Sequence, residues 1–240
     1  MNGIHKDMKA CLIISGGDYD DTCIKVTAAP EGTAVYCNAK KNDREADKAY
    51  SFVIACDRGY HHAVRMGVLP DLLVSDFDSF DGEVDERVRI ERHPTAKNDT
   101  DTMLAVKYAL EHGYQKIDII CGLGGRADHT FANYQVGVYA AGRGADIAFL
   151  SSDTRIYFLS GEGGDPLELD PVEGFGLSVF SMTEKCTGLV LKDVAYEADG
   201  IELSHDAADL TGESNEFSDV GKSAFISLKR GILMVMVCRK

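Results

Sequence analysis

Short apolar runs that alternate with helical segments are the feature that most constrains how this chain can fold. In the first 150 residues, five such runs have the length of strands; they cover 10–14, 51–56, 71–74, 117–121 and 146–150. A strand that is apolar on both faces must be covered on both faces, as in a parallel sheet flanked by helices. We therefore expect an α/β domain with a parallel sheet.

Two helices are predicted between these strands, over residues 100–112 and 128–142. Apolar residues at helical spacing form one face of each: Met103, Val106 and Leu110 in the first, and Phe131, Tyr134 and Val138 in the second. Each helix thus has an apolar face with which to cover the sheet.

The pattern changes after about residue 150. Strand-sized segments separated by Gly, Asp and Ser turns then follow one another without a helix between them; they cover 154–159, 175–180, 188–191, 223–228 and 232–238. The tripeptide Lys229-Arg230-Gly231 is expected to join the last two as a β-hairpin. We therefore predict an α/β domain over residues 1–150 and a small all-β domain over residues 151–240.

Composition excludes several classes of function. The 39 acidic and 25 basic residues give a formal net charge of -14, which argues against nucleic acid as a partner because its binding needs a cationic surface. No apolar run approaches the roughly 20 residues that span a bilayer, so no membrane association is expected. Seven cysteines without a Cys-x-x-Cys pair are a poor disulfide framework. The predicted location is the reducing cytoplasm.

Carboxylates gather where the predicted strands end. Asp57 follows one strand, Asp76 and Asp78 follow the next, and Asp99 and Asp101 precede the first helix. Ligands of open parallel sheets bind outside the carboxyl ends of the strands. A single Asp at such a place is usually a turn former or a helix cap, but several at one edge would repel one another without a bound cation.

A glycine-rich turn, Gly122–His129, joins the strand at 117–121 to the second helix. Its amides are candidates for binding an anion at the helix N-terminus, and a close-packed turn is an equally good interpretation. The turn also fits the G-x-G-x-x-A pattern of dinucleotide-binding dehydrogenases. The acidic residue expected about 20 positions later is absent, however, because Asp146 begins its strand, and Arg126, Asp128 and His129 crowd the turn.

Other motifs carry less information. Ser15-Gly16-Gly17 follows the first predicted strand and could contact a nucleotide or simply form a turn. The chain lacks the Walker A pattern and the Gly-x-Ser-x-Gly elbow, which disfavours P-loop nucleotide hydrolases and the commonest serine hydrolases. His61 and His62 are expected to lie on the surface, because adjacent residues of a helix diverge.

Taken together, the segments resemble the thiamine pyrophosphokinase family, from residue 10 to the C-terminus. The similar stretches are Ile14–Gly17, Ala55–Gly59, Gly67–Ser79, Lys97–Thr102, Gly122–Thr130 and Gly212–Glu216. The Pro-Asp-x-x-x-x-Asp-Phe-Asp-Ser block, together with the later Thr-Asp and Gly-Gly-Arg-x-Asp, is a specific combination, although each motif alone is weak.

The resemblance implies an N-terminal Rossmann-like α/β domain that binds ATP and a C-terminal β-sandwich that binds thiamine. It also implies a homodimer with the acceptor site at the subunit interface, and Mg²⁺ as the cofactor. The implied Mg²⁺ ligands are Asp57, Asp76, Asp78 and Asp101. The implied catalytic residues are Asp76, Asp78, Asp101, Arg126 and Asp128.

Substrate contacts follow from the same resemblance. The implied ATP-binding residues are Gly16, Gly17, Asp57, Lys97, Asp99, Arg126 and His129. The implied thiamine-binding residues are Asp128, Ser214 and Asn215. Arg58, Tyr60 and His61 stand where the family has small or amide residues, and the chain has no Trp to stack on thiamine. Phe217 is a candidate to replace that Trp. Packing in the core of the β domain is the other interpretation of Phe217.

The residue types suit diphosphoryl transfer from ATP to a primary alcohol, which needs positioning and charge neutralisation. Arg126 and Lys97 are suited to pair with phosphate charge. Asp128 is expected either to orient or deprotonate the attacking hydroxyl, or to form a salt bridge with Arg126. An enzyme of similar scaffold acting on another alcohol, such as a hydroxymethyl pterin, is the alternative; a Rossmann-type nucleotide-binding module or dehydrogenase is a third hypothesis.

Overall fold

The structure is a computed structural model of the chain, and it describes residues 9–22, 24–29, 32–37, 50–77, 80, 82–94, 99–205, 212–218 and 221–240. The chain divides into two compact units. The first unit comprises Met1–Val136 and Phe149–Ser152, and the second comprises Gly137–Ala148 and Asp153–Lys240. The division passes through one helix and one strand, α3 (Ala127–Ala141) and β8 (Asp146–Leu150).

The first unit follows the predicted alternation of strands and helices. Its elements are β1 (Ala10–Ile14), β2 (Ile24–Ala29), β3 (Gly32–Cys37), β4 (Phe52–Cys56), α1 (Gly59–Arg65), β5 (Leu72–Ser75), β6 (Arg89–Arg92), α2 (Asp101–Glu111) and β7 (Lys116–Ile120). Of these, α1, β6 and the antiparallel pair β2–β3 were not predicted.

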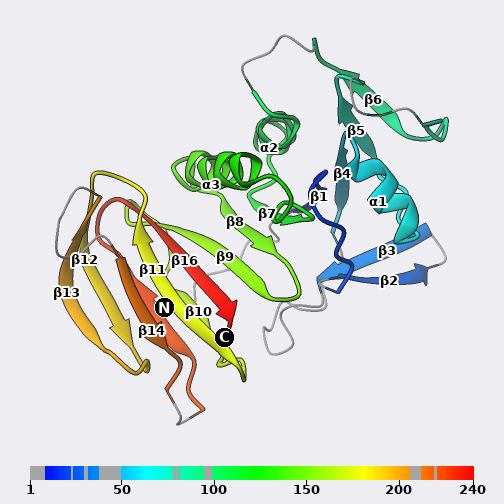
Figure 1. The fold of residues 1–240 in the computed structure, drawn as a ribbon. Coiled ribbons are helices and arrows are strands. Elements are labelled where there is room, and N and C mark those ends of the chain that lie inside the picture. The colour runs from blue at the N-terminus through cyan, green and yellow to red at the C-terminus, as the bar shows by residue number, and fades with distance from the viewer. Residues whose placement is uncertain are drawn as a thin grey trace. The chain divides into compact units, whose positions relative to one another are not determined.

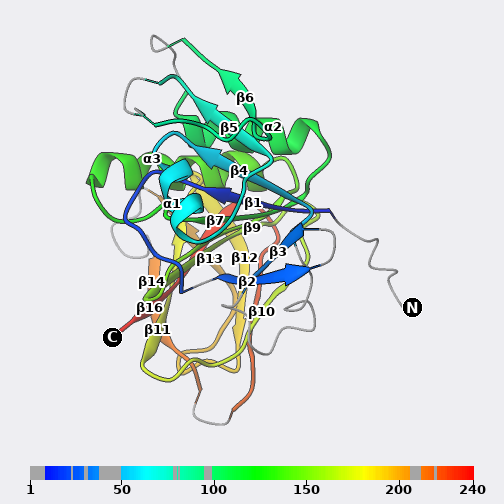
Figure 2. The same ribbon diagram turned by 90° about the vertical axis from the view of Figure 1, so that its right-hand side faces the viewer.

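A parallel sheet organises this unit, with strand order β7-β1-β4-β5-β6. Figure 2 looks onto it and shows β1, β4, β5 and β6 lying side by side. In Figure 1, α1 and α2 lie on opposite faces of these strands. Strands β1 and β5 are buried along their whole length, as expected for a sheet covered on both faces. The carboxyl ends of all five strands therefore lie at one edge.

Helix α1 packs tightly against the end of β1. A Cβ at Gly59 would overlap the carbonyl oxygen of Ile14, so only glycine allows the helix to begin this close to the strand. At seven residues, α1 is too short to show the periodicity by which helices are found in a sequence.

Helices α2 and α3 lie where they were predicted, but of the six residues of the predicted apolar faces only Val106 is buried. In α2 the buried residues are small or β-branched: Thr102, Ala105, Val106 and Ala109. In α3, Phe131 is 62% exposed whereas Asn133, Val136 and Ala140 are buried. The prediction followed the largest apolar side chains, but small side chains let a helix backbone approach a sheet most closely.

The second unit contains the remaining strands, all of them antiparallel. They are β9 (Thr154–Ser160), β10 (Leu167–Leu169), β11 (Phe175–Ser181), β12 (Lys185–Lys192), β13 (Ala198–Ser204), β14 (Gly212–Glu216), β15 (Ala224–Ser227) and β16 (Ile232–Arg239). Two sheets form, with strand orders β14-β11-β16-β9 and β10-β15-β12-β13.

The predicted hairpin at residues 229–231 was wrong. Strand β15 pairs with β10 and β12, whereas β16 pairs with β11 and β9, so the tripeptide joins two different sheets. Lys229 and Arg230 donate their N–H groups to the carbonyl of Thr187, which holds the connection on β12. Gly231 has φ +93°, and this left-handed residue turns the chain into the other sheet.

The structure confirms a mixed α/β fold that has both parallel and antiparallel strands. The division into domains at residue 150 stays a prediction. None of the described helices is long and apolar enough to cross a bilayer. The cysteines within the described residues (Cys11, Cys56, Cys121, Cys186 and Cys238) are free thiols.

Candidate active site

The carboxyl edge of the parallel sheet brings several predicted site residues together. Asp57 follows β4 directly, Asp76 follows β5, and Gly16 and Gly17 lie just beyond β1. The turn that begins at Gly122 follows β7, which pairs with β1. Segments far apart in the sequence thus meet at one edge, the place where parallel sheets bind ligands.

A buried hydroxyl joins the two acidic segments of this edge. Ser75, the last residue of β5, donates its Oγ–H to Oδ1 of Asp57 at 2.9 Å. The same Oγ accepts the N–H of Phe77, also at 2.9 Å. Asp57 and Phe77 both have left-handed backbones, with φ +46° and φ +62°. Such residues are uncommon outside turns and ligand sites.

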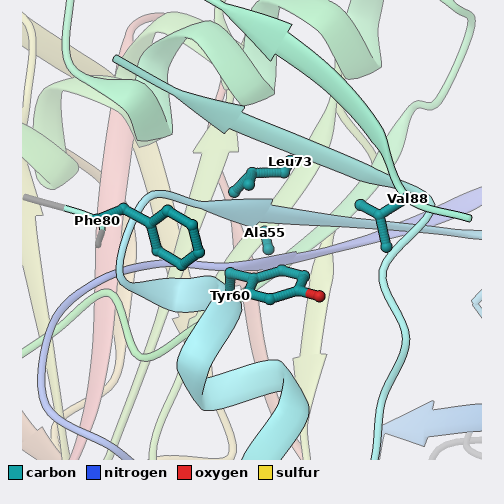
Figure 3. Packing of buried hydrophobic residues seen from close by; sticks show 5 residues of the cluster. All are labelled: Ala55, Tyr60, Leu73, Phe80 and Val88. Carbon is teal, nitrogen blue, oxygen red and sulfur yellow. The ribbon is translucent and has the colours of Figure 1, made fainter. Parts of the chain in front are cut away.

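Aromatic side chains support the turn after β5. Tyr60 of α1 packs edge-on against Phe80, with ring centroids 5.5 Å apart. Figure 3 shows both rings over Ala55 and Leu73, with the Tyr60 hydroxyl pointing toward Val88. That hydroxyl accepts the backbone N–H of Asp85 at 2.9 Å. Tyr60, one of the departures from the family pattern, therefore has a packing role.

The beginning of α2 is tied to the same edge. The Cys56 thiol at the end of β4 lies 3.7 Å from the carbonyl oxygen of Asp101. The buried hydroxyls of Ser15 and Thr102 are 2.9 Å apart, which links β1 to the first turn of α2. These contacts place Asp101 near Asp57.

Asp99 is differently engaged, since its Oδ2 accepts a hydrogen bond from Lys107 Nζ at 2.6 Å. The salt bridge is partly exposed. In this structure Asp99 is therefore paired within its own segment of the chain.

The two glycines after β1 differ in their surroundings. The N–H of Gly17 donates to the carbonyl of Cys121 at 2.8 Å, and a Cβ on Gly17 would overlap that carbonyl oxygen. Gly17 thus joins two strand ends, and its amide is already used. Its own carbonyl lies 2.9 Å from His62 Nε2, so His62 is not the simple surface residue that was predicted. Burial lowers the pKa of His62 below 6.5, outweighing this hydrogen bond.

The glycine-rich turn already contains an anionic group. Gly124 and Gly125 have φ +80° and +66°, and the N–H of Gly125 donates to Oδ2 of Asp18 at 2.9 Å. A Cβ on Gly124 would overlap the Asp18 carboxylate. The predicted capacity of this turn to bind an anion is therefore met here by a carboxylate from the chain itself.

Arg126 and Asp128 form the salt bridge that was one of the two interpretations of Asp128. Arg126 donates Nε–H to Oδ1 at 3.1 Å and an Nη2–H to Oδ2 at 2.6 Å. The side chains are 71% and 62% exposed. The guanidinium lowers the pKa of Asp128 below its usual value, which makes this carboxylate a weak base. The exposed His129 donates its backbone N–H to Asp128 Oδ1.

The residues suit Mg²⁺ by donor chemistry, because carboxylate oxygens are its preferred protein ligands. Asp57, Asp76 and Asp101 lie at the edge described above. Within the described residues, however, no group of three or more His, Cys, Asp or Glu is placed to hold a metal ion. The predicted ligand Asp78 and the predicted ATP contact Lys97 lie outside the described residues.

Asn215, a predicted thiamine contact in the second unit, makes four hydrogen bonds and is only 3% exposed. Its Oδ1 accepts the N–H groups of Tyr196 and Glu216, at 3.0 and 2.9 Å. Its Nδ2 donates to the Tyr196 carbonyl at 2.7 Å and to Glu213 Oε1 at 3.0 Å. The side chain therefore clasps the backbone of Tyr196. Ser214, its neighbour on β14, is exposed.

Residues 44–149 match the family model described as thiamin pyrophosphokinase, catalytic domain. The model thus identifies a thiamin pyrophosphokinase catalytic domain in this segment of the chain. The matched segment contains β4, β5, α2, β7 and the glycine-rich turn, which together form most of the edge described above. The match supports thiamine pyrophosphokinase as the enzymatic activity.

Solved structures titled as thiamin pyrophosphokinases have the same fold. The Bacillus subtilis protein is 21% identical with TM-score 0.71, covering 97% of this chain and all of that one. The Enterococcus faecalis family protein is 23% identical with TM-score 0.70, covering 97% and 99%. The yeast protein is 15% identical with TM-score 0.64, covering 99% and 88%. No curated protein matches the chain.

Three residues that make the contacts described above escaped sequence reasoning. Ser75 was included only as a letter of the Asp-rich block, Asp18 was not singled out, and Tyr196 was not considered. Ser75 had a signal, since a polar residue closes an otherwise apolar strand. The contacts of Asp18 and Tyr196 are made to residues 107 and 19 positions away, which no local pattern encodes.

Proposed function

We propose that this chain transfers the diphosphoryl group of ATP to the hydroxyl of thiamine and releases thiamine diphosphate and AMP. The alcohol oxygen forms a bond to the β-phosphorus, the bond between that phosphorus and the α,β-bridging oxygen breaks, and the alcohol proton is lost. The observation that carries this proposal is the meeting of Asp57, Asp76 and Asp101 with the glycine-rich turn at one edge of the sheet, inside the segment that matches the family.

We propose that Arg126 pairs with phosphate charge at this edge. Its guanidinium is engaged by Asp128 but is largely exposed, so a triphosphate could share or displace that partner. We assign Asp128 the role of orienting the acceptor hydroxyl more than that of removing its proton, because its pKa is lowered by Arg126. Lys97, Gly16, Asp99 and His129 complete the proposed ATP contacts.

We propose Mg²⁺ as the cofactor, held by Asp57, Asp76, Asp78 and Asp101. When bound, it would neutralise phosphate charge as the bond to the leaving AMP breaks. The role of the four carboxylates is to bind and orient it. Their chemistry supports the assignment, as does the need of neighbouring carboxylates for a compensating charge.

We propose that the N-terminal Rossmann-like domain binds ATP and that the C-terminal strands form a β-sandwich that binds thiamine. Ser214 supplies an exposed hydroxyl there. Tyr196 is 64% exposed and its backbone is held by Asn215, so it is the aromatic ring that this unit offers to the acceptor, in preference to Phe217. In this proposal Asn215 does not contact thiamine but holds the backbone of Tyr196, whose ring does.

We further propose a cytoplasmic homodimer in which each acceptor site is completed by the partner. The second unit carries Ser214, Asn215 and Tyr196 of the proposed thiamine site but lacks the ATP-binding motifs, which supports a shared site. Analytical ultracentrifugation at the assay concentration should give a dimer. A fully active monomer would contradict this arrangement.

Product analysis with ATP labelled at both the β- and γ-phosphorus tests the reaction. The expected result is thiamine carrying both labels and an equal amount of AMP. A product with the γ-label alone, released together with ADP, would overturn the proposal. Parallel reactions with thiamine and with a hydroxymethyl pterin, each followed by AMP formation, show which alcohol is the acceptor.

A further inference from the structure

Ser75 is a fully buried polar residue at the centre of the candidate site. Its side chain is 0% exposed, and it makes one hydrogen bond to Asp57 and one to the backbone of Phe77. We propose that Ser75 is a positioning residue, whose hydroxyl holds the Asp57 carboxylate and the Asp76–Phe77 turn in the one arrangement that binds the metal–ATP complex. This inference rests on the proposed function.

The direction of the two hydrogen bonds is determined by chemistry. The N–H of Phe77 can only donate, so Ser75 Oγ is the acceptor in that contact. A hydroxyl carries a single proton, and the Asp57 carboxylate can only accept it when ionised. The Ser75 proton is therefore committed to Asp57 Oδ1. Replacing the hydroxyl removes both contacts at once.

The backbones on either side of this hydroxyl give it more than a packing role. Asp57 and Phe77 both have positive φ, a conformation that persists only where its surroundings enforce it. The N–H of Asp57 is fixed separately, by donation to the carbonyl of Val74 at 2.9 Å. With its backbone anchored in this way, the direction of the Asp57 side chain depends on Ser75.

The turn that Ser75 holds is also fixed from outside. The Phe77 ring lies 4.1 Å below the Arg92 guanidinium, and its centroid is 5.7 Å from that of Phe80. These contacts retain the Phe77 side chain when Ser75 is changed, so loss of the hydroxyl should alter the backbone between Ser75 and Phe77 more than the packing around it. Asp76 lies within that backbone.

The test is the affinity of the full chain for Mn²⁺ bound to an ATP analogue with a methylene bridge between its α- and β-phosphorus. This analogue cannot undergo the proposed cleavage, and electron paramagnetic resonance measures bound Mn²⁺ without turnover. Ser75→Ala should weaken binding by about 10- to 100-fold, the usual effect of removing a group that orients a metal ligand. In the turnover assay, KM for thiamine should stay within about twofold of wild type.

Two comparisons separate positioning from general stability. Ser181→Ala removes another buried hydroxyl, from a residue of β11 that is 5% exposed and whose Oγ donates to the Thr183 carbonyl at 2.7 Å; it should leave binding of the Mn²⁺ complex unchanged. A double-mutant cycle with Asp57→Asn asks whether Ser75 acts through Asp57. In the Asp57→Asn background, Ser75→Ala should have a smaller effect than in the wild-type background, because only its contact with the Asp76–Phe77 turn remains to be lost.

Equal losses in the wild-type and Asp57→Asn backgrounds would overturn the proposal, as would wild-type affinity in a folded Ser75→Ala protein. If Ser75→Ala does not fold, Ser75→Cys is a slightly larger replacement with only a weak donor and acceptor, and the same titration should again show weakened binding. A wild-type protein that binds the complex but makes no thiamine diphosphate refutes the proposed function alone. A wild-type protein that binds no Mn²⁺ complex overturns both.

Discussion

Replacement of Asn215 by Ala distinguishes a structural clasp from a direct substrate contact. The side chain makes four hydrogen bonds, three of them to backbone groups of Tyr196 and Glu216. A buried polar group left without a partner costs about 1–3 kcal/mol, and these three groups are partly buried, so water relieves part of the cost. We expect Asn215→Ala to lower the free energy of unfolding by about 3 kcal/mol. For a chain of this size, that is a fall in Tm of about 6–12 °C.

Urea and thermal unfolding followed by circular dichroism provide the measurement, with Ser214→Ala as the matched control. Ser214 is the preceding residue of β14 but is exposed, so its loss should change the unfolding free energy by less than about 0.5 kcal/mol. Asn215→Ala should also raise KM for thiamine more than KM for ATP, because Tyr196 is no longer held. An unfolding curve that coincides with wild type would refute the clasp and return Asn215 to the role of a direct ligand.

Three further predictions follow from the candidate site. Asp76→Asn and Asp101→Asn should each reduce AMP formation at least about 100-fold with an unchanged circular dichroism spectrum; activity near wild type in both would remove them from the metal site. Asp18→Asn keeps an acceptor for the Gly125 N–H but removes a negative charge that repels the phosphates of ATP, so KM for ATP should fall about threefold. A rise in KM would show that the carboxylate assists ATP binding. Burial holds the pKa of His62 below its unfolded value near 6.5, so the unfolded state binds more protons than the folded state does. The free energy of unfolding should therefore decrease as pH falls from 7.5 to 5.5, and it should decrease less in His62→Gln. An equal decrease in both proteins would exclude His62 as its cause.

Sequence patterns predicted the scaffold because its strands are dictated by local composition. The strand at 10–14 is recognisable from its own apolar residues. The predicted start of the helix at residue 100 agrees with the structure, where Thr100 Oγ1 accepts the N–H of Met103, three positions later. The salt bridge between Arg126 and Asp128 is also local, because the two residues are two positions apart. It was one of the two roles offered for Asp128. Because the strands are parallel, their carboxyl ends lie at one edge of the sheet, and no long-range sequence signal is needed to predict this.

What the sequence did not reveal depends on side chains that meet across elements. Nothing near Gly231 indicates that β15 and β16 enter different sheets, because the carbonyl that redirects the chain belongs to Thr187. Similarly, Asp18 occupies the glycine-rich turn through a contact 107 positions away. The helix faces were predicted only in part for a related reason. Periodicity reports where large apolar residues lie, whereas a close sheet surface selects small ones.

The central place of β1 in the parallel sheet has a consequence for synthesis of the chain. Its two neighbours are β4, which ends at residue 56, and β7, which ends at residue 120. At about 5–20 residues per second, one edge of this fully apolar strand stays unpaired for roughly 3–13 s after the other has its partner. An exposed strand edge is a template for pairing with another chain, so aggregation during translation should begin from β1. Slower translation between residues 56 and 120 should therefore lower the yield of folded protein.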